Sequence, residues 1–335
     1  MYSSDLRENN NFDTLRLMLA VLVFFAHWNG LTQQGMTNVL FHLSRYAVDM
    51  FFIVSGFLIF WSFDNDQRVK NFFIKRFFRI FPLYAILIFF QTIFLISFSD
   101  GSLYETLRYF VANLLFLNFL SPTVGSIFSD LQVNAINGSL WTLKNEVVFY
   151  LLLPLIFRFY QKWGLGFLSL LYAASVMYMI AVDYIGVEKL LVQFPAQLRL
   201  FLTGIFFYLL IRKIDTRHSM WLALVALCLV VLLSDNRLFR FALYPATLGF
   251  LVVWIVFFVK SVKIPFDFSY SFYILHFPVI QIVLYFQLNP ENPVGSFILL
   301  FATVLLLSYL SEKYIEKRFI GMGKDLIEVY KKHAN

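Results

Sequence analysis

Charged residues are scarce in this chain. Only 14% of its 335 residues are Asp, Glu, Lys or Arg, against about 25% in an ordinary soluble domain. Hydrophobic residues make up 60% of the sequence, and aromatic residues alone make up 20%. A water-soluble globule of this size could not hide so much apolar surface from solvent. The composition therefore excludes a soluble enzyme and a disordered protein, and it predicts a multi-pass membrane protein.

Cysteine and metal-ligand patterns are also nearly absent. The single cysteine, Cys228, allows no intramolecular disulfide, which excludes a disulfide scaffold. The sequence contains no His-x-x-x-His spacing, no nucleotide-binding loop and no long basic-aromatic pattern. We therefore expect no metal site and no nucleic-acid partner. Basic loops on the cytoplasmic side of a membrane explain the net charge of +7 better than a nucleic acid does.

Apolar runs recur along the whole chain, and about ten of them are long enough to cross a bilayer. A spanning helix takes about 20 mainly apolar residues. These runs predict an all-α, polytopic helical bundle in which one membrane domain fills residues 1–335, with membrane lipids as its surroundings. The predicted spans are 12–30, 43–62, 77–98, 140–160, 164–184, 194–211, 219–234, 239–259, 268–288 and 295–314.

A further apolar run, 105–120, is assigned by the distribution of Lys and Arg, which are enriched in cytoplasmic loops. If this run does not cross, the basic loops at 64–79 and 212–217 and the basic C-terminal tail all fall on one side of the membrane. If it crosses, every later basic cluster moves to the other side. We therefore predict an external loop over 99–138 that holds a short interfacial or re-entrant helix, with both chain termini in the cytoplasm.

The first span carries two ionisable side chains, which are costly in a membrane and by default indicate a functional path. Arg16 and His27 are eleven positions apart, which on a helix gives a rise of roughly 16 Å and leaves the pair about 20° from alignment. Both side chains are expected on one stripe, with Arg16 near the cytoplasmic edge and Asp13 as its ion-pair partner. The alternative is a snorkelling arginine and an interfacial histidine.

The second span holds a small-residue pair. Asp49 lies near its outer end, and Ser55-Gly56 falls near its middle. A small pair in an apolar helix favours close packing against another helix. Ser55 lacks the flanking glycines of a nucleophile elbow, so it is a poor candidate nucleophile.

The fourth span begins after a predicted turn and carries a carboxylate. Asn137-Gly138 predicts the turn, and Ser139 is a candidate N-cap for the helix that follows. Glu146 and Tyr150 are four positions apart and share one helical face. A carboxylate at this depth needs a partner or water.

Basic residues gather where the third span begins. Arg76 and Arg79 are three positions apart, with Lys75 beside them, at the predicted cytoplasmic entrance. Guanidinium groups offer planar bidentate donors to phosphate, although the same residues could instead set topology or contact anionic lipid headgroups. In the ninth span, Tyr270 and His276 add polar groups, for which a hydrogen-bonded packing role is the simpler interpretation.

Five motifs, in order along the chain, resemble the membrane acyltransferase family 3, the O-acyltransferases that modify bacterial surface polysaccharides. The first is the Arg-x10-His pair at Arg16 and His27, and the second is DMFFIVSGF at 49–57. The others are RFFRIFPLY at 76–84, SLWTLKNEVVFY at 139–150 and SYSFYILH at 269–276. Each motif alone is weak, but together they span most of the chain and are specific.

The resemblance implies transfer of an acyl group, usually acetyl, from cytoplasmic acyl-CoA to a sugar hydroxyl of a surface polysaccharide such as O-antigen, capsule or exopolysaccharide, at the bacterial inner membrane. No metal is implied. The catalytic roles would fall to His27, Glu146 and Arg16. The acetyl-CoA cosubstrate would be bound by Arg76, Arg79, Lys75 and Tyr84. The glycan or lipid-linked glycan acceptor would be bound by Asp49, Ser139, Trp141, Tyr150 and His276.

Several mechanisms and functions fit these residues. Histidine, with an unperturbed pKa of about 6.5, suits deprotonation of a sugar hydroxyl near neutral pH. Direct attack by the sugar with His27 as base and a transient acyl-enzyme are both open, and we favour the first. A proton-coupled transporter or flippase that uses Arg16, Glu146 and His27 fits the intramembrane charges equally well. A noncatalytic membrane scaffold leaves the ordered polar motifs unexplained.

The topology is testable with single cysteines in a Cys228→Ser background. Ser126→Cys, in the predicted external loop, should react with a membrane-impermeant maleimide on intact cells. Asn65→Cys, in the predicted cytoplasmic loop, should react only after the cells are permeabilised. Labelling of Asn65→Cys but not of Ser126→Cys on intact cells would contradict the predicted orientation.

Overall fold

The fold comes from a computed structural model that describes residues 10–34, 38–211, 219–233, 236–264, 266–289 and 291–334. Within these residues the chain is helical and has no β-strand. It forms two compact units, each built from three separate stretches of sequence. Unit 1 comprises Met1–Arg16, Val48–Gln67 and Asn145–Ile264, and unit 2 comprises Leu17–Ala47, Arg68–Lys144 and Pro265–Asn335. Of the basic residues used in the topology argument, Arg212, Lys213 and Arg217 lie outside the described residues.

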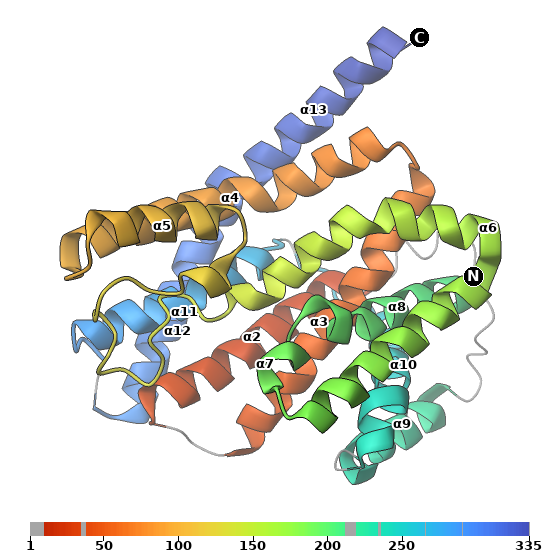
Figure 1. Cartoon of the computed structure of the whole chain (residues 1–335), viewed down its shortest axis with the longest axis horizontal. Coiled ribbons are helices and arrows are strands. Elements are labelled where there is room, and N and C mark those ends of the chain that lie inside the picture. Colours follow the sequence, from red (N-terminus) through yellow and green to blue (C-terminus); the bar gives the residue numbers. More distant parts are fainter. Residues whose placement is uncertain are drawn as a thin grey trace. The chain divides into compact units, whose positions relative to one another are not determined.

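The long helices coincide with the predicted spans to within a few residues, except at α4, which begins eight residues early. They are α2 (Phe12–Thr32), α3 (Asn38–Asn65), α4 (Val69–Phe98), α6 (Leu140–Ile185), α8 (Phe194–Leu210), α9 (Ser219–Leu233), α10 (Tyr244–Phe257), α11 (Ser269–Tyr285) and α12 (Pro293–Ser311) (Figure 1). The shorter elements are α5 (Leu103–Leu114), η1 (Asn118–Leu120), α7 (Glu188–Leu191), the π-helical turns η3 (Phe239–Leu243) and η4 (Glu312–Glu316), and the C-terminal helix α13 (Lys317–Ala334).

Seven helices in the described part of the chain are long and apolar enough to cross a membrane. Helices α9 and α11 are apolar but shorter. Helix α6 covers two predicted spans, and Gly164, with φ 64°, interrupts it between them. The two halves of α6 fold back on each other (Figure 1). The structure thus supports a multi-pass membrane protein, while the count of about ten spans and the orientation of the termini stay predictions.

The run 105–120 is the apolar segment predicted not to span. Its part up to Leu114 lies in the 12-residue helix α5, which at 1.5 Å per residue is too short to cross. A capping box formed by Ser102 and Glu105 begins the helix. After α5, the loop is tied back to its start, because Ser126 donates its hydroxyl and its amide to the Asp100 carboxylate at 2.6 and 2.7 Å. These hydrogen bonds lower the pKa of Asp100.

Helix α5 packs against α4 with its polar side inward. Thr106, Tyr109 and Asn113 are buried, and the Tyr109 hydroxyl donates to Gln91 of α4 at 2.8 Å. The opposite side carries exposed large apolar residues, among them Leu103, Leu107 and Val111. An outward apolar stripe is expected of a helix that contacts lipid. This arrangement agrees with the predicted interfacial helix.

In unit 2, α13 runs alongside the first half of α4 (Figure 1). Gly323 allows this approach, because a Cβ there would lie 2.9 Å from Cβ of Phe78. Further along, the Lys70 ammonium sits 3.2 Å from the centre of the Tyr330 ring. The π-helical turn η4 joins α12 to α13 and sets which face of α13 meets α4.

In unit 1, α3 and α8 cross in close contact at two glycines. A Cβ on Gly56 would overlap the backbone carbonyl of Phe201, and a Cβ on Gly204 would overlap the carbonyl of Ile53. The helix backbones therefore touch directly, which confirms the packing role predicted for Ser55-Gly56. Phe52 and Phe149 pack against the Phe201 ring and complete this part of the core.

The α3–α8 contact predicts that one added methyl group at Gly56 lowers the stability of the fold. Gly56→Ala should lower the thermal stability of the detergent-purified protein, because the helices must separate and overpacking costs about 1–3 kcal/mol. Gly166→Ala is the matched control, since a Cβ at Gly166 meets no atom within 4 Å. A melting temperature equally unchanged in both variants would contradict the direct backbone contact.

Candidate active site

Two histidines meet in unit 2. Nδ1 of His27, on α2, lies 2.7 Å from Nε2 of His276, on α11. The two imidazole rings are nearly parallel, with centroids 5.0 Å apart and an interplanar angle of 15°. The other ring nitrogen of His276, Nδ1, lies 3.2 Å from the carbonyl oxygen of Phe272, one turn back on α11. The structure thus joins two residues that lie 249 positions apart in the sequence.

Aromatic side chains enclose this histidine pair. Phe277 meets the His27 ring edge-on at 5.1 Å, and Tyr273 meets the His276 ring edge-on at 5.7 Å. Phe24 meets the His276 ring from α2 at 6.3 Å. His276 is fully buried, whereas His27 is half-buried. His27 is therefore the more exposed member of the pair.

The segment before α6 holds α11 in place beside the pair. The Asn137 amide donates to the carbonyl of Ile274 at 2.9 Å, and Gly138 lies under the Phe277 ring, where a Cβ would come within 2.7 Å. The Thr142 and Tyr273 hydroxyls are 2.8 Å apart. The predicted turn thus exists and touches the residues that surround the histidines.

Ser139 lies where the helix start was predicted, directly before α6. Its side chain is fully buried, and its hydroxyl donates to the Asn137 side-chain oxygen at 2.7 Å. The residue therefore stabilises the turn through Asn137. Trp141, two positions on, is half-buried at the beginning of α6.

The carboxylate of Glu146 forms a small cluster in unit 1. Its Oε1 accepts hydrogen bonds from Tyr150 at 2.7 Å and from Ser55 at 3.1 Å. The shared face predicted for Glu146 and Tyr150 is confirmed, and the partner that the carboxylate needs is supplied by two hydroxyls. Ser55 comes from the SGF segment of α3, so this cluster joins two of the sequence motifs.

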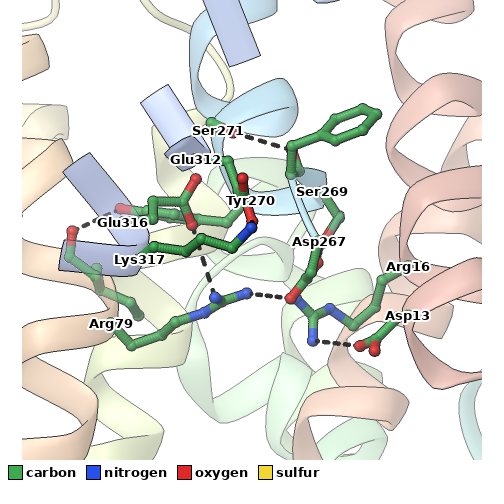
Figure 2. A network of polar contacts seen from close by, with 12 residues as sticks. Asp13, Arg16, Arg79, Asp267, Ser269, Tyr270, Ser271, Glu312, Glu316 and Lys317 are labelled. Carbon is green, nitrogen blue, oxygen red and sulfur yellow. Dashed lines mark hydrogen bonds and ion pairs between the residues drawn. The ribbon is translucent and has the colours of Figure 1, made fainter. Parts of the chain in front are cut away.

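Arg79 is held between two carboxylates (Figure 2). Its Nη2 lies 2.7 Å from Oδ2 of Asp267, and its Nη1 lies 3.7 Å from Oε2 of Glu316. Glu316 is buried and Asp267 is half-buried. The Asp267 carboxylate also accepts from the Ser269 hydroxyl at 2.8 Å. The Arg79 guanidinium therefore ties α4 to the start of α11 and to the π-helical turn η4.

A second ion pair lies on the same turn. Lys317 reaches back to Oε1 of the buried Glu312 at 2.9 Å (Figure 2). Nearby, the Tyr270 hydroxyl donates to the backbone carbonyl of Ile80 at 2.8 Å. Two buried carboxylates on one π-helical turn are unusual, and such turns are frequent at functional sites.

The remaining predicted residues lie as follows. The ion pair expected for Arg16 is present, with Asp13 at 3.6 Å. Asp49 accepts from the Tyr244 hydroxyl at 2.6 Å. Lys75 and Arg76 are half-buried on α4, and the Arg76 guanidinium lies over the Phe72 ring at 5.6 Å.

Tyr84, expected at the donor site, is fully buried. Its hydroxyl donates to the carbonyl of Asn113 and accepts from the Asn118 amide at 2.9 Å, while its ring stacks on Phe116 at 4.3 Å. In this structure Tyr84 anchors the loop that follows α5.

Sequence reasoning missed the carboxylates around Arg79. Asp267 directly precedes the SYSFYILH motif, and Glu312 and Glu316 stand four positions apart at the end of an apolar run. Acidic residues in such places indicate an ion pair or a hydrogen bond inside the protein, because a carboxylate next to an apolar span needs a cation or a donor. Arg199 was also missed; it is buried on α8, and its Nε lies 2.7 Å from the Met179 sulfur.

The apolar helices and the paired polar groups between them define a multi-pass membrane protein with a histidine-centred candidate site. The chain belongs to the acyltransferase family whose model is described as "Acyltransferase domain", which it matches over residues 9–313. It is therefore an acyltransferase, and the family resemblance read from the motifs is confirmed.

Curated relatives agree with this assignment. The chain is 29% identical to the O-acetyl transferase of Shigella phage Sf6, over 94% of this chain and 97% of that protein. It is 31% identical to Nodulation protein 10 of Rhizobium leguminosarum bv. viciae, over 46% of each chain. It is 25% identical to Peptidoglycan O-acetyltransferase OatA of Listeria monocytogenes, over 52% of this chain and 30% of that protein. No solved structure matches the chain.

The contacts of Arg79 predict that this residue stabilises the fold. Arg79→Met should lower the melting temperature, because it leaves the buried Glu316 carboxylate without its cation, and an uncompensated buried charge costs up to about 3–5 kcal/mol. Adding Glu316→Gln to Arg79→Met should recover part of the loss, since the buried charge is then removed as well.

Arg318→Met is the matched control, because it removes an exposed positive charge from the same part of the chain. The control should melt like the wild type. Equal melting temperatures for Arg79→Met and Arg318→Met would show that Arg79 makes no net contribution to stability.

Proposed function

We propose that this protein transfers an acyl group, in the simplest case acetyl, from cytoplasmic acyl-CoA to a sugar hydroxyl of a surface polysaccharide. O-antigen, capsule and exopolysaccharide are the acceptor types, and the bacterial inner membrane is the location. The observation that carries the proposal is His27. It is half-buried, it is held by a second histidine, and it belongs to a chain that matches the acyltransferase family over residues 9–313.

The reaction needs a base more than it needs activation of the donor, because a thioester carbonyl is already electrophilic and a sugar hydroxyl is a weak nucleophile. His27 removes the hydroxyl proton as the sugar oxygen attacks the thioester carbon. The new carbon–oxygen bond forms, the carbon–sulfur bond breaks, and the proton passes from His27 to the leaving sulfur. The products are the acylated sugar and free CoA, so no further reactant is required.

CoA is a polyanion, and the cations that we assign to it are Arg76 and Lys75 on α4. Both are half-buried and lie on the helix that carries Arg79. Arg79 itself is held by Asp267 and Glu316. In this proposal it sets the position of α4, and its positive charge adds to the attraction for the CoA phosphates. Arginine offers bidentate donors to phosphate, and lysine acts as a point charge.

A glycan acceptor is supported by the relatives. One of them is named a peptidoglycan O-acetyltransferase and another an O-acetyl transferase. Acetylation of a hydroxyl is therefore the reaction type that we assign to this chain. Arg16, Glu146, Asp49, Trp141 and Tyr150 keep their proposed catalytic and acceptor roles on the strength of the motifs that contain them.

Incubation of the purified protein with radiolabelled acetyl-CoA and an acceptor glycan tests this proposal. Label should enter the glycan with the wild type. With His27→Ala transfer should fall about 10²–10⁴-fold, the usual contribution of a general base, while expression and membrane insertion stay normal. His333→Ala, which removes a histidine from the end of α13, is the control and should transfer label at the wild-type rate.

Two results would count against parts of this proposal. Full activity of folded His27→Ala would remove His27 from the mechanism. Proton-coupled uptake of a glycan into proteoliposomes, without any label transfer, would favour a transporter that uses the same intramembrane residues.

A further inference from the structure

Both ring nitrogens of His276 are in use, and their partners fix where the proton sits. Nδ1 lies 3.2 Å from the carbonyl oxygen of Phe272, and a carbonyl oxygen can only accept. Nδ1 of His276 must therefore carry a hydrogen. A neutral imidazole has one N–H, so Nε2 of His276 is left as an acceptor.

The neutral form is the one that this environment favours. The rings in contact with the pair are those of Phe24, Tyr273 and Phe277. Within the described residues, neither imidazole makes a hydrogen bond or an ion pair with a carboxylate. A charged imidazolium buried without a counter-ion is costly. His276 therefore offers an acceptor to its neighbour.

The tautomer of His27 follows from this acceptor. Nδ1 of His27 is 2.7 Å from Nε2 of His276, and a hydrogen bond at this distance needs exactly one hydrogen between the two nitrogens. That hydrogen must come from His27 Nδ1. The lone pair of His27 is then on Nε2, which makes no hydrogen bond to any described residue.

We propose that His276 is a positioning residue that holds His27 in the Nδ1–H tautomer and leaves Nε2 as the basic nitrogen. This inference rests on the proposed function, in which His27 is the base. It replaces the substrate-binding role expected for His276, because a fully buried ring with both nitrogens engaged has no group left for a substrate.

His276 also acts after the proton has moved. Once Nε2 has taken the hydroxyl proton, the positive charge spreads to Nδ1–H of His27. The hydrogen bond to His276 then becomes charge-assisted and stronger than in the resting state. An interaction that strengthens as the reaction proceeds lowers the barrier.

The position of His276 depends on the motif around Ser139. Asn137 binds the backbone of α11 at Ile274, and Gly138 leaves room for the Phe277 ring that packs against His27. Thr142 contacts the Tyr273 hydroxyl. These contacts fix the rotation of α11, and so they keep Nε2 of His276 directed at His27.

Nitrogen-15 NMR of histidine-labelled protein in lipid bilayers tests the tautomer without any substrate. His27 should show a protonated Nδ1 and an unprotonated Nε2. The signals are assigned by their loss in His27→Gln, since the chain has five histidines. A His27 that carries its proton on Nε2 in the wild type would overturn the proposal outright.

Two substitutions distinguish the loss of the hydrogen-bond acceptor at His276 from the loss of the volume of its ring. His276→Leu removes the acceptor, so His27 should become a mixture of tautomers and kcat should fall about 10- to 100-fold, a typical cost of losing the partner that orients a functional histidine, with KM for acetyl-CoA nearly unchanged. His276→Gln restores an acceptor oxygen and should keep the Nδ1–H tautomer and most of kcat. Ser296→Ala is the control, because it removes only the 3.4 Å bond between Trp28 of α2 and Ser296 of α12.

The outcomes distinguish this inference from the proposed function. If the tautomer is lost in His276→Leu and kept in His276→Gln, yet no glycan is acylated by the wild type, His276 positions His27 and the proposed reaction is wrong. If label is transferred but His276→Leu keeps both the wild-type tautomer and kcat, the reaction stands and the positioning role is wrong. If His276→Leu does not fold, the wild-type spectrum and His276→Gln still decide.

Discussion

A polar group in an apolar environment must find its partner within the protein, and several charged groups of this chain meet that constraint. Without water nearby, an unmet donor or acceptor costs several kcal/mol in hydrocarbon. The carboxylate of Glu146 is met by two hydroxyls, and the guanidinium of Arg79 by two carboxylates. Because Ser55 lies on α3 and Glu146 on α6, and because Arg79 lies on α4 and Glu316 on η4, these two contacts also link separate elements within each unit.

The same constraint separates residues that hold the fold from residues available to a substrate. Tyr84 and Arg79 both belong to the RFFRIFPLY motif, yet the side chain of each is already bonded within the protein. His27 differs from them, since only its Nδ1 makes a hydrogen bond within the described residues. A family motif therefore includes side chains that are already bonded within the protein.

Local patterns in the sequence predicted local features well. The Arg16–Asp13 ion pair, the Glu146–Tyr150 contact and the close packing at Gly56 all follow from helical spacing or residue size. Helix ends were also close to prediction, except that α4 begins at Val69 rather than at residue 77. Hydropathy does not predict this helix start, because the basic segment before the apolar run is also helical.

Contacts between distant segments could not be predicted in this way. Nothing in the spacing of a single sequence indicates that His27 meets His276, or that Asp267 and Glu316 meet Arg79. The roles expected for His276 at the substrate and for Arg79 at the donor phosphates were inferred without knowledge of these contacts. Each of these pairings depends on which helices pack together, and hydropathy carries no information about neighbours.

The π-helical turn at Glu312–Glu316 makes the length of this segment matter as much as its chemistry. A π-helical turn holds one residue more than a regular helical turn, so it rotates everything after it by about 100°. Gly323 of α13 faces Phe78 of α4 only with that rotation. A deletion of one residue between 312 and 316 would turn Gly323 away from α4, although every side chain of α13 would be unchanged. The number of residues in this turn is therefore a constraint on the fold in addition to the ion pairs of Glu312 and Glu316.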